Sequence, residues 1–317
     1  GEQCRAAPRA LHRPARRLVS HPRRAIGLLL RRAVPPALKA QVGKRFKARV
    51  RALLGIEPWP DLAVRHPLFR TREYRMLRSA AREFDIEKPS KPVLERGHQA
   101  SYVVAKWFVE GGVRSAFHVG FANGRYLFYL QKLGIPCGGV DLPTEDTRWA
   151  DIPPGALDDA TMRRLVRRDF LALTEADVRP LWGPGATVDV LFSEATVETM
   201  LPWRSQGASV PRYLALSADE RRALLEHGLP DALARMKDWA RNMAFIEPEP
   251  AAGDSGAVFA ACAARLADFQ YSIWAFRPPL DQLFRLSPRY PTRQTVYAFT
   301  RDTGLLGALA PYAERMR

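Results

Sequence analysis

Cysteine is scarce in this chain of 317 residues, and long apolar runs are absent. The three cysteines, Cys4, Cys137 and Cys262, are far apart and form no C-x-x-C pair, so neither a zinc site nor a disulfide framework is predicted. This usage fits a reducing compartment. The six histidines show no metal-binding spacing such as H-E-x-x-H, so no metal is predicted. Because no run of about eighteen apolar residues occurs, no membrane-spanning helix is predicted either.

Acidic side chains are almost missing from the N-terminal part of the chain. Residues 1–51 hold 15 Lys and Arg and a single acid, Glu2. The other 266 residues hold 34 basic and 32 acidic side chains, so most of the net charge of +16 lies in this arm. A GC-rich genome explains part of the bias toward arginine over lysine, but it does not explain the lack of acids. We therefore predict a separate basic arm, residues 1–57.

The arm contains an amphipathic helical pattern. After Pro35 and Pro36, basic residues lie between apolar positions at helical spacing, which are Leu38, Val42, Phe46, Val50, Leu53 and Leu54. Residues 24–54 are therefore a candidate contact with an anionic membrane surface, which predicts a cytoplasmic protein held on the inner face of a membrane. Binding to nucleic acid phosphates and simple packing on the rest of the chain are alternatives. Mitochondrial targeting, typical of Arg-rich and acid-poor N-termini, is a further one.

Residues 58–96 are predicted to form a helical connector. Thr71 is a candidate helix cap, and a proline-containing linker, 88–92, follows the helix. A second helix is predicted over 98–109, with Trp107 and Phe108 in the core. The apolar face of the first helix comprises Tyr74, Leu77, Ala81 and Phe84. Candidate contacts with a small-molecule substrate are His98, Tyr102 and Trp107.

A strand, a glycine-bearing turn, a helix and a second strand are predicted between Ser115 and Asp141. Gly120, Ala122 and Gly124 keep the turn thin, so that backbone N–H groups can approach a ligand. The helix covers about residues 125–133, and the second strand covers 135–140. Asp141 then lies just past the carboxyl end of that strand. At this edge of a parallel sheet an acid typically holds a pair of ribose hydroxyls, so the pattern predicts a nucleoside site.

Further strands follow in regular order. They are predicted over 165–170, ending at Asp169 and Phe170, then over 188–193 and 243–247, and finally over 269–276 and 295–300. A helix is predicted over 218–241. The incomplete G-x-G-x-x-G pattern disfavours an NAD-dependent oxidoreductase.

Several motifs follow one another in a fixed order: the G-x-A-N-G-R turn, the V-D-L, D-F and D-V-L-F-S strand ends, and the acid after the last of them. This ordered set resembles class I S-adenosylmethionine-dependent methyltransferases. The resemblance covers residues 97–302 and leaves 303–317 as a C-terminal tail. It implies an α/β fold with a doubly wound, mostly parallel, seven-stranded sheet. It also implies S-adenosylmethionine as the cofactor and a transferase activity.

By position, the resemblance also implies roles for single residues. The turn would pass beneath the methionine part of the cofactor, Asp141 would hold the ribose, and Asp169 with Phe170 would frame the adenine. Two positions depart from the family: His118 stands where an acid usually anchors the cofactor's amino acid end, and Thr199 stands where many relatives have histidine. The predicted cofactor-binding residues are His118, Gly120, Ala122, Asn123, Gly124, Asp141, Asp169, Phe170 and Ser193.

Catalysis is assigned to acids that follow the fourth strand. Glu194 and Glu198 are four residues apart, so they are expected on one helix face as candidate bases, with His98 and Glu247 behind them. Aromatic and arginine residues at 203–213 suit sugars, phosphates or aromatic acceptors. Together with the basic arm, they predict O-methylation of a glycan, glycolipid or other membrane-proximal molecule. The alternative is a catalytically degenerate scaffold, or an RNA-associated subunit, that uses the arm to bind an anionic partner.

Overall fold

The structure, a computed structural model, describes residues 64–85, 91–143, 152–197, 217–248, 255–284 and 294–316. All of them belong to one compact unit, Asp61–Arg317. The predictions for the basic arm, for the aromatic insertion at 203–213, and for Glu198 and Thr199 lie outside the described residues.

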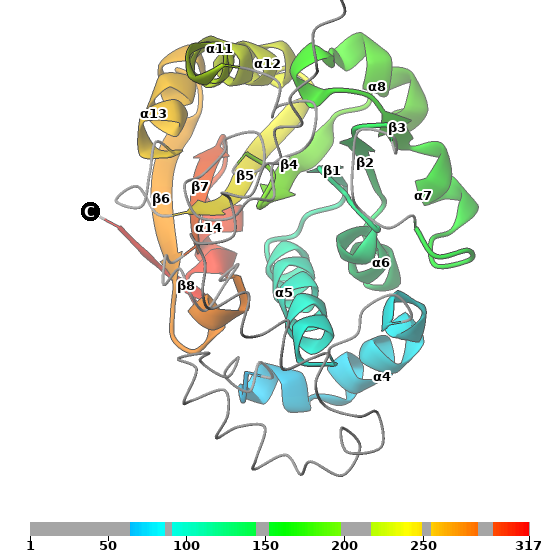
Figure 1. Cartoon of the computed structure of the whole chain (residues 1–317). Coiled ribbons are helices and arrows are strands. Elements are labelled where there is room, and N and C mark those ends of the chain that lie inside the picture. Colours follow the sequence, from blue (N-terminus) through cyan, green and yellow to red (C-terminus); the bar gives the residue numbers. More distant parts are fainter. Residues whose placement is uncertain are drawn as a thin grey trace, which may run out of the picture. The chain divides into compact units, whose positions relative to one another are not determined.

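An eight-stranded sheet forms the centre of this unit (Figure 1). Its strand order is β3-β2-β1-β4-β5-β7-β6-β8. The pairs among β1 to β5 are parallel, whereas β7 is antiparallel to both β5 and β6, and β8 is antiparallel to β6. The predicted α/β class with a mostly parallel, doubly wound sheet is confirmed.

The strands lie close to their predicted positions because apolar runs fill the middle of the sheet. Their bounds are β1 Ala116–Val119, β2 Cys137–Asp141, β3 Leu165–Arg167, β4 Val188–Glu194, β5 Ala240–Pro248, β6 Gln270–Phe276 and β7 Gln294–Thr300. Strand β4 is an example: six of its seven residues are buried, as expected for a central strand covered on both faces. The third strand is shorter than predicted, because Asp169 caps a 3₁₀ helix instead of ending the strand.

The sheet has eight strands where the sequence predicts seven. The segment predicted as a C-terminal tail contains α14 (Gly304–Leu309) and β8 (Ala313–Arg315), and β8 pairs with β6. Two of the three β8 residues are exposed, so the strand has no apolar pattern. It is held by backbone pairing with β6 and by Ala313, which is buried in the core. Trp107 of α5 donates a hydrogen bond of 2.8 Å to the carbonyl of Leu305, which joins α14 to the core.

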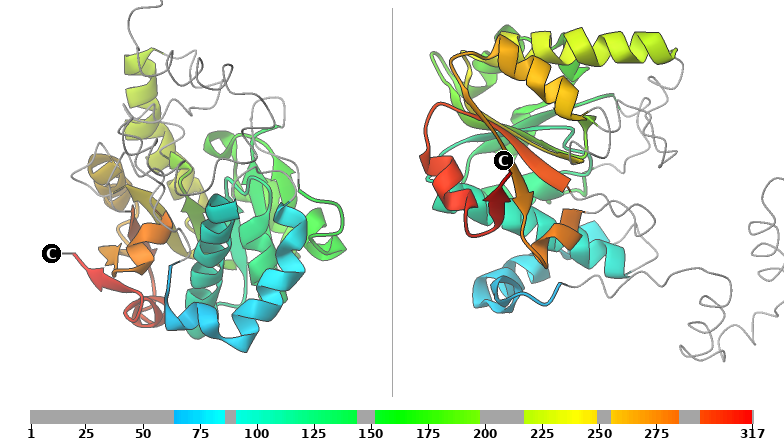
Figure 2. Two further views of the ribbon diagram at one scale, coloured as in Figure 1. Left: turned by 60° about the horizontal axis from the view of Figure 1, so that its bottom comes forward. Right: turned by 90° about the vertical axis from the view of Figure 1, so that its left-hand side faces the viewer.

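Helices cover both faces of the sheet in three layers (Figure 2). One face carries α5 (Lys91–Glu110), α6 (Arg125–Lys132) and α14, and α4 (Arg72–Ala80) packs on this layer. The other face carries α8 (Glu175–Trp182), α12 (Leu229–Met236) and α13 (Ser255–Arg265). The short helix α7 (Asp159–Arg163) contacts β2. Trp107 and Phe108 are fully buried, as predicted.

The connector helix begins where the sequence predicts. The Thr71 hydroxyl accepts a hydrogen bond of 3.2 Å from the backbone N–H of Tyr74 and caps α4. Tyr74, Ala81 and Phe84 are buried along its apolar face, and Leu77 is half-buried. The candidate substrate contacts His98, Tyr102 and Trp107 are buried as well, at 0%, 1% and 0% exposure.

The long helix predicted over 218–241 is interrupted. Helix α11 (Ala218–Ala223) runs into a π-helical turn, Leu224–Gly228, before α12 begins. Pro230 lacks an N–H and therefore cannot make the regular hydrogen bond to residue 226, which favours the wider turn. Helix α12 ends at Met236, and β5 starts four residues later.

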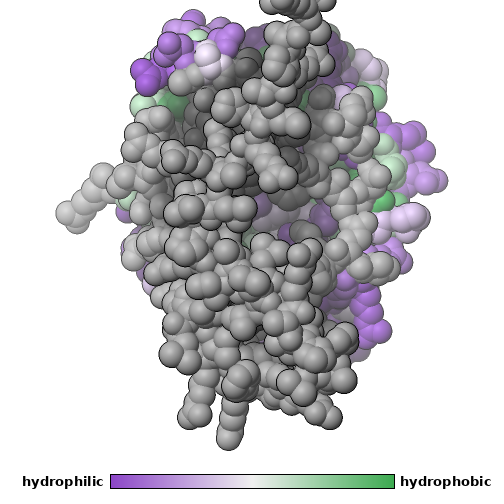
Figure 3. Space-filling model, in the orientation of Figure 1, coloured by the Kyte–Doolittle hydropathy of each residue, from purple (hydrophilic) through white to green (hydrophobic). Residues whose placement is uncertain are grey.

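The described helices expose mainly polar side chains, together with a few apolar ones such as Met76 of α4 and Met162 of α7. In Figure 3, hydrophilic residues gather over α11 at the upper left and over α7 and α8 at the right-hand edge. No helix in the described ranges is long and apolar enough to cross a bilayer.

Candidate functional site

The candidate site lies at the carboxyl ends of β1, β2 and β4. Strand β1 is paired with β2 on one side and with β4 on the other, so the chain leaves the sheet in opposite directions at this point. In open α/β sheets, such a switch point is where loops diverge and ligands bind. We call this set of strand ends and the loops after them the carboxyl edge.

The turn after β1 is held in a left-handed backbone conformation at three positions. Gly120, Ala122 and Gly124 have φ angles of 74°, 48° and 76°. A side chain at Gly120 would overlap Thr196, which follows β4, so the two loops touch here. Gly124 caps α6 without a side-chain hydrogen bond, and the side-chain Oδ1 of Asn123 accepts one of 3.3 Å from the backbone N–H of Arg125. The predicted thin turn is therefore present and pressed against β4.

Asp141 ties this turn to the end of β2. One carboxylate oxygen accepts a hydrogen bond of 2.6 Å from the N–H of Ala122, and the other accepts one of 2.8 Å from Leu142. Burial raises the pKa of Asp141, although these hydrogen bonds and the charge of Arg167 oppose the shift. Each oxygen accepts one of these bonds and can accept at least one more, so both retain a position for a ligand hydroxyl.

Glu194 ends β4 on the face covered by α5 and α6. The hydroxyl of Tyr126 lies near this carboxylate, so that each group affects the pKa of the other. Burial raises the pKa of Glu194, while the positive charges of Arg125 and Arg96 lower it. Burial also keeps the Tyr126 phenol protonated by raising its pKa well above the ordinary value. The pair thus comprises a carboxylate that can accept a proton and a protonated phenol near it.

The prediction that Glu194 and Glu198 lie on one helix face is wrong for Glu194. Glu194 is the last residue of β4, and Ala195 after it has a φ of 55°, which a right-handed helix does not allow. The position of Glu194 therefore comes from the strand. Glu198 lies outside the described residues.

Glu247, predicted as a second-choice base, is fully buried and occupied by the loop after β4. Its Oε1 accepts hydrogen bonds from the hydroxyl of Ser193 at 3.2 Å and from the N–H groups of Thr196 and Val197 at 3.0 and 2.9 Å. These contacts fix the loop. Ser193 consequently points to the sheet face opposite that of Glu194, since successive strand residues alternate.

His118 lies within β1 and is 2% exposed. Its ring stacks on Phe192 with 4.4 Å between centroids and meets the ring of Tyr126 edge-on. Within the described part of the chain, neither ring nitrogen has a hydrogen-bond partner. Burial lowers the pKa of His118 to about 3, so the ring is neutral at physiological pH. It therefore brings no negative charge to the position where the family usually has an acid.

The predicted adenine frame lies next to β3. A carboxylate oxygen of Asp169 accepts a hydrogen bond of 3.0 Å from the N–H of Leu171, which caps a 3₁₀ helix. Phe170 is 4% exposed and packs in the core with residues of β2 and α8. Their role in binding adenine stays a prediction.

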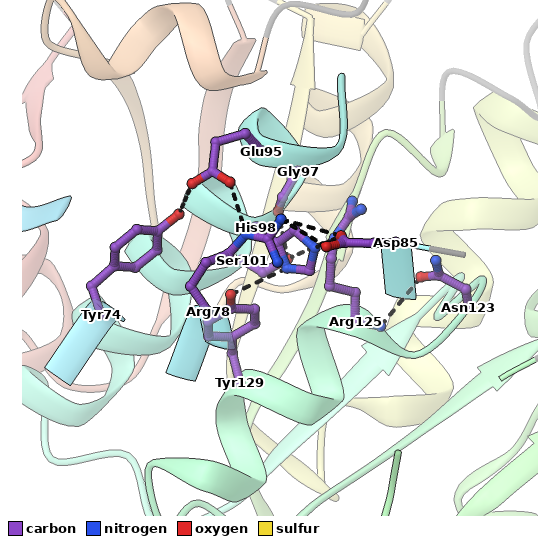
Figure 4. Close-up of polar contacts among 10 residues, drawn as sticks. All are labelled: Tyr74, Arg78, Asp85, Glu95, Gly97, His98, Ser101, Asn123, Arg125 and Tyr129. Atoms are coloured by element: carbon purple, nitrogen blue, oxygen red, sulfur yellow. Dashed lines mark hydrogen bonds and ion pairs between the residues drawn. The ribbon is translucent and has the colours of Figure 1, made fainter. Parts of the chain in front are cut away.

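His98 belongs to a polar network that links α4, α5 and α6 (Figure 4). Its Nε2 lies 3.0 Å from a carboxylate oxygen of Asp85, and its Nδ1 lies 3.2 Å from the hydroxyl of Tyr129. Burial and the nearby Arg125 and Arg78 lower the pKa of His98 to about 3. A neutral ring must then donate to Asp85 through Nε2 and accept from Tyr129 through Nδ1, because a carboxylate has no proton to give. Both nitrogens are occupied, which leaves none for a reacting group.

Sequence reasoning missed four residues of the site. Tyr126 and Arg125 open α6, Arg96 lies on α5, and Thr196 joins the loop after β4 to β1 through a hydrogen bond of 3.0 Å to the carbonyl of Val119. The dipeptide Arg125-Tyr126 directly after the last turn glycine was the available signal, because residues there face the carboxyl edge. In the described ranges, no cluster of residues suitable for a metal ion occurs.

Comparisons with known proteins return methyltransferases at low similarity. A TehB-like SAM-dependent methyltransferase of Corynebacterium glutamicum is 13% identical, with 73% of this chain and 97% of that chain covered and a TM-score of 0.38. Magnesium protoporphyrin IX methyltransferase of Synechocystis with bound SAH is 13% identical, with 73% of this chain and 96% of that chain covered and a TM-score of 0.37. A putative O-methyltransferase of Klebsiella pneumoniae is 10% identical, with 84% of this chain and 100% of that chain covered and a TM-score of 0.37. Neither a protein-family model nor a curated protein matches the sequence.

Replacing His118 by leucine is expected to stabilise the protein by about 1 kcal/mol, because an unpaired buried polar group costs about 1–3 kcal/mol and leucine has a similar volume. The free energy of unfolding in urea measures this change. His98→Leu is the matched control: it removes two hydrogen bonds and should destabilise. If His118→Leu lowered the free energy of unfolding as much as His98→Leu does, the ring of His118 would have to have a polar partner.

Proposed function

We propose that this protein is an S-adenosylmethionine-dependent methyltransferase. The observation that carries the proposal is the arrangement at the switch point: the left-handed turn after β1, Asp141 at the end of β2 and Glu194 at the end of β4 lie at one edge of the sheet. This arrangement and the ordered strand ends in the sequence support the same function independently of overall similarity.

The residues at the nucleoside end of the site fit the cofactor. Asp141 retains acceptor positions for a ribose hydroxyl pair. The turn has no side chain at Gly120 or Gly124, and its largest side chain, Phe121, is buried at 1% exposure. At the amino acid end, the neutral His118 offers no counter-charge for an ammonium group. The fit therefore rests on the nucleoside half.

The chemistry divides between the cofactor and the chain. S-adenosylmethionine, when bound, supplies a methyl group on a sulfonium centre for in-line attack by an acceptor oxygen. Glu194 accepts the proton from that oxygen, and its raised pKa makes it a better base than an ordinary carboxylate. The protonated Tyr126 hydroxyl lies near this carboxylate. Positioning of the cofactor and the acceptor contributes the rest of the rate acceleration.

For the acceptor, we propose a hydroxyl on a glycan, glycolipid or other molecule close to a membrane. The basic arm supports the membrane part of this proposal: 15 cationic residues among the first 51 suit an anionic surface. The polar pair of Glu194 and Tyr126 supports a hydroxyl acceptor, because a hydroxyl must lose a proton during methyl transfer.

Calorimetric titration with S-adenosylmethionine tests the cofactor. Wild-type protein should bind with a micromolar dissociation constant, and Asp141→Ala should bind about 10- to 100-fold more weakly, since a hydrogen bond to a charged group contributes about 1.5–3 kcal/mol. Asp268→Ala is the matched control, because this acid pairs with Arg301 and not with the site. A folded wild type that binds no S-adenosylmethionine contradicts the proposal and favours the degenerate scaffold.

The raised pKa of Glu194, which supports its assignment as the base, is tested by measuring stability as a function of pH. A carboxyl whose pKa is raised in the folded state favours folding when protonated and opposes it when ionised. Glu194→Gln should therefore increase the free energy of unfolding relative to wild type at pH 7.5 more than it does near pH 4. Urea unfolding at both values measures the difference, with the exposed Glu83→Gln as the control. An equal effect at both pH values would contradict a raised pKa.

The arm proposal is tested by co-sedimentation of the full chain with vesicles of phosphatidylglycerol and phosphatidylcholine. We expect binding at 0.1 M salt that decreases as salt rises, and loss of binding when Lys39, Lys44 and Lys47 are changed to glutamate. Vesicles of phosphatidylcholine alone are the control. Retention of a single-stranded RNA in place of the anionic vesicles would reject the membrane and support nucleic acid.

A further inference from the structure

Arg167 ends β3 directly beside Asp141, the acid at the end of β2. The two strands pair in a register that makes the Cα atoms of these two residues partners. The backbone N–H of Arg168 also donates a hydrogen bond of 2.8 Å to the carbonyl of Asp141, which fixes the two strand ends together. Side chains at paired positions of neighbouring strands share one face of a sheet. Arg167 therefore lies at the carboxyl edge, next to the acid of the nucleoside site.

Two contacts hold the guanidinium of Arg167 in place. Its central carbon lies 4.7 Å from the centre of the ring of Phe121, which belongs to the turn after β1. Its Nη1 donates a long hydrogen bond of 3.4 Å to the carbonyl of Leu142, the residue after Asp141. A guanidinium over an aromatic ring is attracted by the electrons of the ring face. The side chain of Arg167 thus joins the turn after β1 to the end of β2.

The guanidinium remains accessible, whereas the ring beneath it does not. Arg167 is exposed, and Phe121 is buried at 1% exposure. Because Phe121 covers one side of the guanidinium, the surface that Arg167 exposes is turned away from that ring. The charge of Arg167 lowers the pKa of Asp141, in keeping with these distances. The edge therefore presents a flat cation that is supported from behind by an aromatic ring.

The aromatic residue predicted to frame the adenine offers much less surface. Phe170 is 4% exposed and packs in the apolar cluster that contains Val140. The side chain of Val140 points away from that of Asp141, because successive strand residues alternate between the faces of a sheet. A flat base needs an accessible flat surface on which to stack. Arg167 provides one on the face of Asp141, and Phe170 does not.

A second arginine on the same segment makes a similar contact at a different place. The central carbon of Arg164 lies 4.6 Å from the ring centre of Trp182. A Cβ built at Gly138 would meet Arg164, whereas one built at Gly139 would meet Phe121. Because neighbouring strand residues point to opposite faces, the two arginine–ring pairs lie on opposite faces of the sheet. This second pair therefore serves as an internal comparison.

We propose that Arg167 is a cofactor-binding residue on which the adenine of S-adenosylmethionine stacks, with the ring of Phe121 behind it. This proposal rests on the proposed methyl transfer and adds to it a residue that recognises the purine base. A guanidinium is planar and delocalised, so a base stacks on it as it does on an aromatic ring. Because the protein already holds the group in place, less entropy is lost on binding. An anionic ligand group suits this position less well, since Asp141 would repel it.

Calorimetric titration of the full-length protein with S-adenosylhomocysteine and with adenosine tests the proposal. Arg167→Gln should weaken the binding of both ligands about tenfold and by the same factor, because both contain the base. Arg167→Lys should lose as much as Arg167→Gln does, since lysine keeps the positive charge but has no flat group.

Arg164→Gln is the matched control. It removes the same kind of arginine–ring contact on the opposite face of the sheet and should leave both affinities unchanged. Thermal melting shows whether each variant is folded. Because Arg167 is exposed, its replacement by glutamine or lysine is expected to leave the fold intact.

Three outcomes overturn the proposal while the proposed function stands. In the first, Arg167→Gln binds S-adenosylhomocysteine as tightly as wild type does. In the second, Arg167→Lys keeps the wild-type affinity, which would assign the role of this residue to its charge. In the third, only S-adenosylhomocysteine binding falls and adenosine binding does not, which would place the contact at the amino acid end of the cofactor.

Failure of the proposed function gives a different result. A folded wild-type protein would then bind neither S-adenosylmethionine nor S-adenosylhomocysteine, and the adenosine titration alone would decide whether Arg167 contacts an adenine base. If adenosine does not bind either, the proposal for Arg167 is rejected together with the function.

Discussion

The geometry of the carboxyl edge depends on two carboxylates that accept hydrogen bonds from backbone N–H groups. Asp141 holds the turn after β1 against β2, and Glu247 holds the loop after β4 against β5. The bonds from Ala122 to Asp141 and from Thr196 and Val197 to Glu247 each join a strand end to a loop that belongs to a different strand, so the loops are fixed with respect to the sheet. Because the turn also presses on Thr196, neither loop can shift without disturbing the other. The site is therefore built from the sheet outward, with side chains such as Glu194 directed by strand alternation and not by loop conformation.

The sequence predicted the sheet well because buried parallel strands are short apolar runs that end in polar residues. The runs at 188–193 and 295–300 lie within two residues of β4 and β7 at both ends, and Gly134 marked the end of α6. The same reasoning failed at β8, whose exposed residues carry no apolar pattern, and at the interrupted helix around Pro230, where a missing N–H rather than periodicity decided the geometry. At the site, Asp141 was predicted from its place after a strand. Arg96 and Tyr126 were not, because their importance arises from the crossing of α5 and α6, which no local pattern encodes.

Several polar groups at the edge are placed at a cost in stability. Glu194 is a desolvated carboxylate, and His118 is a buried ring whose nitrogens have no partner among the described residues. Such groups are frequent in functional sites, where a perturbed pKa serves the chemistry. Other buried polar groups are fully satisfied: His98 has a partner on each nitrogen, and Glu247 accepts three hydrogen bonds. This difference separates residues that support the fold from residues that are available for a reaction, and it removes His98 and Glu247 from the list of candidate bases.

The two buried histidines, His98 and His118, also make the stability of the fold decrease as the pH falls. In the unfolded chain a histidine takes up a proton below a pH of about 6.5, whereas His98 and His118 resist protonation until about pH 3 in the folded state. Acid therefore favours the unfolded chain progressively between these values, and the two histidines act together because α5 and β1 belong to the same core. Charging His98 would also remove the acceptor for the hydroxyl of Tyr129, so acidification would weaken the contact between α5 and α6.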